Sequence, residues 1–441
     1  MIRKVSFIFG YVARICVMIV LLVSCVKNEI QTGNVIFIHP DGMGLSNWTA
    51  TRVYYYGPDG YLHWDRLPYV GLYRGHIKNS LTASSQAGAS IHAYGVKASY
   101  KAYGMEDGKQ IQALSGNYKS IMQEAMDFGI KVGVVNSGSI VEPGTGVFLV
   151  SETARELSES IAEKIIFSGA SVILSGGEEW LIPETINGRH GAKGKRTDGR
   201  NLINEIKDRG YTIIYSRDEL LSVPVGEEKV LGVFSDGHTF NDGSEEELLR
   251  DGLPLYQTNS PTLAEMTEKA IEILSFGDNQ FFLVVEEEGT DNLANKNNAI
   301  GTLTALKHAD DAIGVASAFL NQNHNTLIIT GSDSEAGGME LLGKRDDGNL
   351  SKIVRREWNG APADGIRGDS SEMFWSKPDN NGNIFPFQIN WSTNSDVSGG
   401  LISRANGLNA NMLNANFDNT DIYRIMYKTL FGKDPDGLLS K

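Results

Sequence analysis

The stretch VVEEEGTDNLANKNNA (residues 284–299) follows directly on the apolar residues Phe281–Leu283. An apolar run of this length predicts a buried β-strand. Three glutamates and then Asp291 stand at its end, where packed carboxylates repel one another unless positive charge lies among them. The stretch therefore indicates a strand whose end meets a cation.

The same rhythm of apolar runs and amphipathic segments extends outward along the chain. Further strands are expected at 35–40, 131–137, 171–177, 211–216, 280–287 and 325–332, and helices at 117–130, 152–169, 198–210, 262–277 and 302–322. Apolar strands that alternate with amphipathic helices are typical of a parallel sheet covered by helices on both faces. The predicted fold class is therefore α/β, with a central, mostly parallel sheet.

Residues 339–395 interrupt this alternation. They are rich in Asn, Asp and Gly and contain Trp358, Trp375 and Trp391. The segment is either a subdomain inserted over the edge of the sheet or a loop-rich crossover. Long structureless stretches are uncommon in compact domains, so an insertion is favoured, with the α/β domain formed by 35–338 and 396–441.

The first residues resemble an export signal. Arg3 and Lys4 precede a largely apolar segment that ends in LVSC, which is typical of a bacterial lipoprotein signal covering residues 1–24. Cys25 would then carry the lipid, residues 25–34 would form a tether, and the protein would lie in the cell envelope, in the periplasm or at the outer membrane. The alternative is an uncleaved membrane anchor.

The charge balance indicates which kinds of molecule the protein could bind. The chain of 441 residues has 54 acidic and 40 basic residues, a formal net charge of −14. Such a surface argues against nucleic acid as a partner and is compatible with cation binding.

Acidic residues follow three of the expected strands. Asp41 follows the first, Glu286 and Asp291 stand at the end of another, and Asp333 follows a third. Ligands of parallel α/β sheets bind at the carboxyl ends of the strands, so these carboxylates are expected to converge. Converging carboxylates predict a site for divalent cations.

The order of several motifs along the chain adds a resemblance to a known family. VIFIHPDGMG (35–44), SSQAGASIHAYGVK (84–97), SGSIVEPGTG (137–146), FFLVVEEEGTDN (281–292) and LIITGSDSEAGGM (327–339) resemble motifs of the alkaline phosphatases, in the family's order. The resemblance extends over nearly all of the chain after the signal. It implies a phosphomonoester hydrolase that acts through a serine nucleophile and bound metal ions.

The resemblance also implies roles for individual residues. Ser85 matches the nucleophile, although Ser84 takes that role if the register differs by one residue, and both could simply cap a helix. Arg155 matches the arginine that holds the phosphate. The matched metal ligands and their neighbours are Asp41, Glu142, Thr145, Glu286, Asp291 and Asp333. Glu287 and Glu288 are expected to face solvent or to tune the site.

Three positions depart from the family pattern. Where the family has zinc-binding histidines, this chain has Asn295, Ser334 and Asp396, and His39 is the one stray histidine close to the expected site. Oxygen ligands favour Mg²⁺, Ca²⁺ or Mn²⁺ over Zn²⁺. Mg²⁺ is therefore the favoured cofactor, and the family's Zn²⁺ is doubtful.

The favoured function is thus a metal-dependent phosphomonoester hydrolase acting on a small phosphorylated substrate, with a homodimer as a possible assembly. The alternative is a catalytically impaired pseudophosphatase that binds a phosphorylated or sulfated ligand. A sulfatase is disfavoured, because the chain lacks the C/S-x-P-x-R run that sulfatases need for their modified residue.

Overall fold

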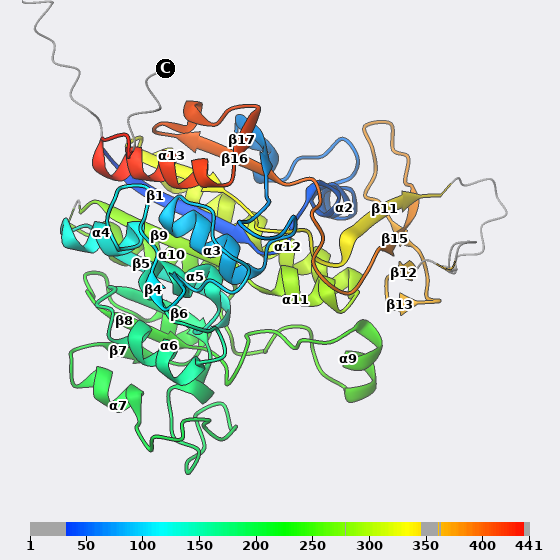
Figure 1. The fold of residues 1–441 in the computed structure, drawn as a ribbon. Coiled ribbons are helices and arrows are strands. Elements are labelled where there is room, and N and C mark those ends of the chain that lie inside the picture. The colour runs from blue at the N-terminus through cyan, green and yellow to red at the C-terminus, as the bar shows by residue number, and fades with distance from the viewer. Residues whose placement is uncertain (1–31, 278, 345–359, 361–362, 436–441) are drawn as a thin grey trace, which may run out of the picture.

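The computed structural model describes residues 32–277, 279–344, 360 and 363–435. Its main sheet has ten strands in the order β17-β2-β16-β10-β1-β9-β5-β6-β8-β7 (Figure 1). The seven strands from β10 to β7 are parallel, and β16 runs antiparallel to both β10 and β2. The strand bounds are β1 Asn34–Pro40, β2 Tyr69–Arg74, β5 Lys131–Ser139, β6 Val172–Gly176, β7 Thr212–Ile214, β8 Val230–Val233, β9 Phe281–Glu287, β10 Thr326–Thr330, β16 Ile402–Gly407 and β17 Asn416–Asp418. The mostly parallel sheet predicted from the sequence is confirmed.

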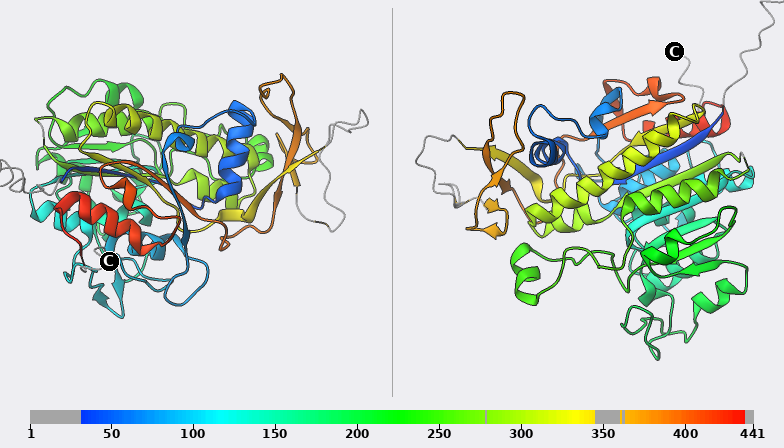
Figure 2. Two further views of the ribbon diagram at one scale, coloured as in Figure 1. Left: turned by 90° about the horizontal axis from the view of Figure 1, so that it is seen from above. Right: turned by 180° about the vertical axis from the view of Figure 1, so that it is seen from behind.

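Helices cover both faces of this sheet, as the view from above shows (Figure 2). One face packs against α3 (Ser85–Tyr94), α4 (Ile121–Asp127), α5 (Pro143–Leu149), α6 (Ser158–Ile166), α7 (Leu202–Lys207) and α13 (Thr420–Phe431). The other packs against α2 (Leu45–Tyr56), α8 (Arg217–Leu221), α10 (Leu263–Ser275) and α12 (Ala299–Leu320).

Strand β1 illustrates why the central strands are apolar throughout. Val35 and Phe37 point into the first helix layer, and Ile36 and Ile38 point into the second. Successive side chains of a strand alternate between faces, so a strand covered on both sides needs apolar residues at every position.

A second, smaller sheet lies beside α2, to the right in Figure 1. It consists of β11 (Met339–Gly343), β12 (Ala363–Gly365), β13 (Gly368–Asp369), β14 (Phe374–Trp375) and β15 (Pro386–Trp391). Trp391 is buried and its indole N–H donates to the Asp364 carboxylate. These strands fall in the range for which an inserted subdomain is predicted, and the exact division into domains stays a prediction.

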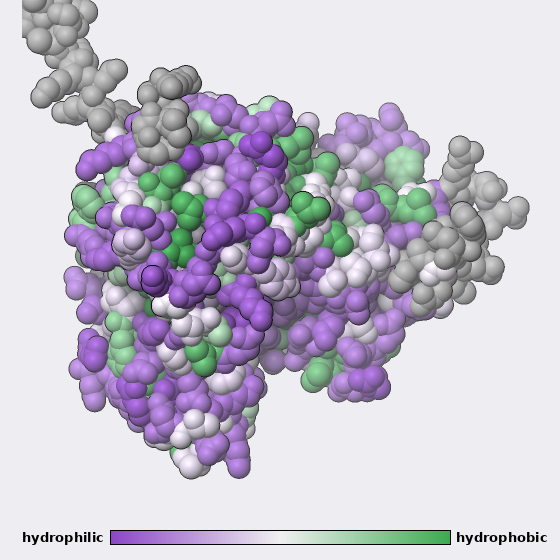
Figure 3. Space-filling model, in the orientation of Figure 1, coloured by the Kyte–Doolittle hydropathy of each residue, from purple (hydrophilic) through white to green (hydrophobic). Residues whose placement is uncertain are grey.

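The expected signal at 1–24 and the lipidated Cys25 lie outside the described residues. Within the described ranges, no helix combines the length and the apolar character that a membrane crossing requires. The face seen in Figure 3 is largely hydrophilic, with scattered apolar patches.

Candidate active site

The carboxyl ends of three neighbouring strands bring the expected acids together. Strand β1 lies between β9 and β10, so Asp41 stands between the residues that follow those two strands. The backbone N–H of Gly42 donates to Asp41 Oδ1 at 3.0 Å and lies 3.4 Å from Asp333 Oδ1. The turn after β1 therefore holds the two aspartates side by side.

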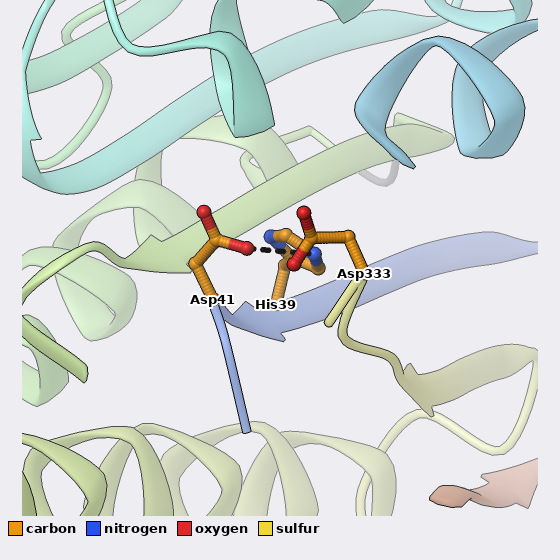
Figure 4. Close-up of side chains that lie close together, drawn as sticks. All are labelled: His39, Asp41 and Asp333. Atoms are coloured by element: carbon orange, nitrogen blue, oxygen red, sulfur yellow. Dashed lines mark ion pairs between the residues drawn. The ribbon is translucent and has the colours of Figure 1, made fainter. Parts of the chain in front are cut away.

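Asp41 is shared by two groups of possible metal ligands. His39, Asp41 and Asp333 form one group, drawn in Figure 4, and Asp41, Glu286 and Glu288 form the other. Within each group, one ligand atom per residue lies within 4.8 Å of the others. The His39 ring lies 3.7 Å from Asp41 Oδ1 through Nε2 and 3.7 Å from Glu286 Oε1 through Nδ1.

Burial makes negative charge at these groups costly. It raises the pKa of Asp41 to about 6, with Glu286 adding to the rise, while hydrogen bonding to Asp333 and Ser85 lowers it. Burial and then nearby carboxylates raise the pKa of Glu288 and Asp333 well above the ordinary range. A divalent cation would offset this repulsion directly.

Buried polar atoms without hydrogen-bond partners also indicate a place for a divalent cation. Among the residues that the structure describes, oxygens of Glu286, Glu288 and Asp333 and both ring nitrogens of His39 are buried without a partner in hydrogen-bond geometry. Buried polar atoms normally have partners. Carboxylate oxygens with one imidazole suit a divalent cation, so the residues around Asp41 fit the metal ions that the sequence predicts.

Two glycines let neighbouring helices approach these carboxylates closely. A Cβ atom at Gly88 of α3 would lie 2.2 Å from Asp333 Cβ, and one at Gly144 of α5 would lie 1.7 Å from Glu286 Oε1. Any side chain at either position would displace the carboxylate. The glycines therefore set how near α3 and α5 come to the acids.

The two candidate serines differ in their roles at the start of α3. Ser84 is the N-cap: its Oγ accepts from the Ala87 N–H at 3.4 Å and donates to the Tyr100 carbonyl. Ser85 is the first helical residue, and its side chain lies close enough to the Asp41 carboxylate to lower the pKa of Asp41. Ser85 therefore lies against the acidic groups, whereas Ser84 has a structural partner on each side.

Arg155 follows α5 and reaches back toward Ser85. Its guanidinium donates to Gln86 Oε1 at 3.2 Å and to Glu142 Oε2 at 3.3 Å. Burial lowers the pKa of Arg155, but the Glu142 and Glu288 charges outweigh this and raise it. A cavity of about 330 Å³ lies beside Arg155 and is lined in part by Trp180 and His238. A fixed cation next to Ser85 can hold an anionic group there.

Thr145 and Glu286 are brought together through a residue that the sequence reasoning missed. The amide of Asn136, in β5, donates to Thr145 Oγ1 at 2.9 Å and also to Glu286 Oε2. Glu142 is the N-cap residue of α5 and is buried beside Arg155. Asn136 follows an apolar run on the strand next to β9, and that position was the only signal that could have identified it.

The expectation that Glu287 and Glu288 face solvent is wrong. Both are buried, and Glu288 belongs to one of the two ligand groups. Glu287 Oε1 accepts from Ser137 at 2.6 Å and from Tyr256 at 3.1 Å. The physical reason is that β9 is covered on both faces, so neither side of its end reaches water.

The replaced positions lie at the edge of the carboxylate cluster. Asn295, the last residue of α11 (Gly289–Asn295), donates through Nδ2 to Asp291 and to Asp396 Oδ1 at 3.0 Å. The Ser334 hydroxyl donates to Asp333 Oδ1 at 3.3 Å. The catalytic and metal-site residues predicted from the sequence thus gather in one region, and their roles stay predictions.

A mostly parallel α/β sheet with buried carboxylates at its strand ends and a serine at the start of a neighbouring helix defines the class, an α/β protein with a candidate metal centre. Comparison with known proteins gives the family. The alkaline phosphatase family model matches residues 32–355. The chain therefore belongs to the alkaline phosphatase family, as the sequence motifs predict.

Named relatives agree with this assignment. The chain is 27% identical to the membrane-bound alkaline phosphatase of Bombyx mori over 67% of its own length, but it spans only 59% of that relative. It is 27% identical to the alkaline phosphatase of Escherichia coli, over 68% of this chain and 69% of that protein. These relatives are phosphoric monoester hydrolases by name.

A solved structure shows the same fold. A variant of the alkaline phosphatase from the Antarctic bacterium TAB5, with Mg bound in its M3 site, is 23% identical to this chain. The TM-score is 0.67, and the alignment covers 91% of this chain and 99% of that one.

Proposed function

We propose that this protein is a metal-dependent phosphomonoester hydrolase in which Ser85 is the nucleophile. The observation that carries the proposal is the position of Ser85 at the start of α3, against Asp41 of the two carboxylate groups and next to Gln86, the residue that Arg155 contacts. Membership of the alkaline phosphatase family supports the reaction class. The substrate class would be small phosphorylated molecules.

Arg155 and Ser85 would have different roles in this reaction. Arg155 would bind oxygens of the phosphoryl group and orient phosphorus in line with Ser85 Oγ. Attack by Ser85 would break the bond between phosphorus and the leaving alcohol, which takes up a proton. Water would then hydrolyse the phosphoserine, which releases inorganic phosphate and restores the hydroxyl.

The residues around Asp41 would hold the cations, namely His39, Asp41, Glu286, Glu288 and Asp333, with Thr145 and Glu142 close by. Divalent ions bound there supply Lewis-acid stabilisation of the negative charge and lower the pKa of the serine hydroxyl. Mg²⁺ is the favoured ion, because the ligands are mainly oxygens. Zn²⁺, Ca²⁺ and Mn²⁺ are the alternatives that a metal titration would separate.

A pair of serine variants tests the nucleophile. Ser85→Ala should abolish phosphate release from a generic aryl phosphate supplied with Mg²⁺, Mn²⁺ or Zn²⁺. Ser84→Ala should keep the activity and lose about 1 kcal/mol of stability, because it removes only a helix cap. Phosphate release that survives in both variants would rule out the serine mechanism.

The comparisons give no support to the alternative of a catalytically impaired pseudophosphatase. The lipid anchor at Cys25, the location in the cell envelope and the homodimer belong to the proposal as well. They rest on the LVSC ending of the apolar N-terminal segment and on the resemblance to the family.

A further inference from the structure

Asn295 has a fixed orientation at the edge of the carboxylate cluster. The backbone N–H of Gly337 donates to Asn295 Oδ1 at 3.1 Å. An amide N–H needs an acceptor, so this contact places the side-chain oxygen toward Gly337 and the NH₂ group on the opposite side. The oxygen that could have served as a metal ligand is therefore engaged elsewhere.

The NH₂ group of Asn295 points at the two remaining acids of this corner. Its nitrogen lies 3.2 and 3.3 Å from the oxygens of Asp291 and 3.0 Å from Asp396 Oδ1. One amide thus donates to two carboxylates that would otherwise repel each other. An NH₂ group has no lone pair for a cation, so it occupies the space between these acids with hydrogens instead.

The Asn295 amide also affects the charge of Asp396. Burial and then the Asp333 charge raise the pKa of Asp396, while the hydrogen bond from Asn295 opposes the rise. At the groups that share Asp41, by contrast, oxygens of Glu288 and Asp333 stay buried and unpartnered within the described residues. The Asn295 amide thus engages the acids of one corner, and the other corner keeps free ligand atoms.

We propose that the Asn295 amide takes the place of a metal ion between Asp291 and Asp396, so that at this carboxylate cluster divalent cations bind only at the two groups that share Asp41. This corner does not fit a metal ion, because the Asn295 NH₂ group occupies the place between the two carboxylates and has no lone pair to offer a cation. Asn295 is then a positioning residue that holds Asp291 and Asp396 together. The inference rests on the proposed function only in assuming that the Asp41 groups bind metal.

Metal counting on the full chain tests this assignment. Protein equilibrated by dialysis with excess Zn²⁺ or Mn²⁺ is expected to hold up to two ions that depend on Asp41, one for each group that shares it, besides any ion at the separate group of His63, Asp310 and Asp311. Asp396→Asn should leave this count unchanged, and Asp41→Asn should remove the ions. A third ion in the wild type that disappears in Asp396→Asn would overturn the inference and leave the proposed function intact.

A gain-of-site variant provides a second readout. Asn295→His supplies a lone pair between Asp291 and Asp396 and should add one Zn²⁺ per chain. Asn292→His, on the same helix α11, is the matched control and should add none. An unchanged count in Asn295→His together with a third wild-type ion would contradict the inference. A wild type that binds no ion would contradict both this inference and the proposed function.

Discussion

Asp41 belongs to both groups of candidate ligands, and its surroundings show why its position is tightly constrained. The Gly42 N–H fixes its carboxylate on one side, and Asp333 and Glu286 lie close to it on the others. Gly88 and Gly144 let α3 and α5 approach those two neighbours. Small changes at any of these positions would therefore alter the spacing of the ligand oxygens.

Arg155 gives a prediction at the residue scale. Its guanidinium contacts Gln86 and Glu142 through two nitrogens, and a lysine cannot reproduce this planar geometry. Arg155→Lys should lower kcat/KM for an aryl phosphate roughly 10–100-fold, because a charged hydrogen bond contributes about 1.5–3 kcal/mol.

The control for this variant is Arg250→Lys, whose guanidinium pairs with Asp251 at the surface. Steady-state kinetics and competition by inorganic phosphate would measure the effect. Full kcat/KM with unchanged phosphate inhibition in Arg155→Lys would refute the role assigned to Arg155.

The sequence predicted the acids of the site but not their polar partners. Asp41, Glu286, Asp291 and Asp333 could be predicted because each follows an apolar run. Asn136 and Ser137 also follow an apolar run. Their contacts with Glu286 and Glu287, however, depend on the pairing of β5 with β9, which no local sequence pattern reveals.

At the scale of elements, α9 (Glu245–Asp251) packs one buried acid against the second sheet. Glu245 Oε1 accepts from the Ile300 N–H at 3.1 Å, and its Oε2 is buried without a partner in the described part of the chain. Burial, and then the charge of Asp364, raise the pKa of Glu245 from 4.5 to about 8. The folded protein therefore keeps this proton at a pH where the unfolded chain has released it.

A pH dependence of stability follows from Glu245. The contribution of the protonated group is fully present below about pH 4.5 and is lost as the pH rises toward about 8, because only the unfolded chain releases the proton in this window. Glu245→Gln should remove this loss and make the free energy of unfolding fall less steeply between these limits, where Asp41 and Glu287 also titrate. Urea unfolding at about pH 5 and about pH 8.5 measures it.

Glu268→Gln, an exposed substitution on α10, is the control and should follow the wild type at both pH values. Each pKa unit corresponds to about 1.4 kcal/mol, so the expected difference is a few kcal/mol. An identical slope in Glu245→Gln and wild type would show that Glu245 titrates as an exposed acid does.

Some strands could be predicted from the sequence and others could not. All six expected strands formed: five are apolar runs inside the sheet, and the sixth, β7, is a three-residue strand at its edge. Strands β2, β16 and β17 at the antiparallel edge were missed, because β2 (YVGLYR) is exposed at four of its six positions and β17 has three residues. The buried strand β8 was missed as well, because its apolar run has only four residues. The strands of the second sheet were not predicted either, because such short segments show no apolar periodicity.

At the scale of the whole molecule, an acidic chain collects several of its carboxylates in its interior. The formal net charge is −14, and burial raises the pKa values of Asp41, Glu288 and Asp333 together. Self-repulsion of this kind destabilises the compact state unless counter-charge is bound. The central claim is therefore that divalent cations stabilise this fold through Asp41.

Thermal unfolding of the wild type and of Asp41→Asn, each in chelator and in excess divalent salt, tests that claim most directly. The wild type should gain about 2.7 kcal/mol of stability at an ion concentration of about 100 times Kd, because the ion binds only the folded state. Asp41→Asn should unfold in chelator at a temperature no lower than the wild type, since it removes a buried charge, and should gain nothing from the salt. A wild type whose unfolding is the same with and without divalent ions, or an Asp41→Asn variant stabilised as much as the wild type, would contradict the account.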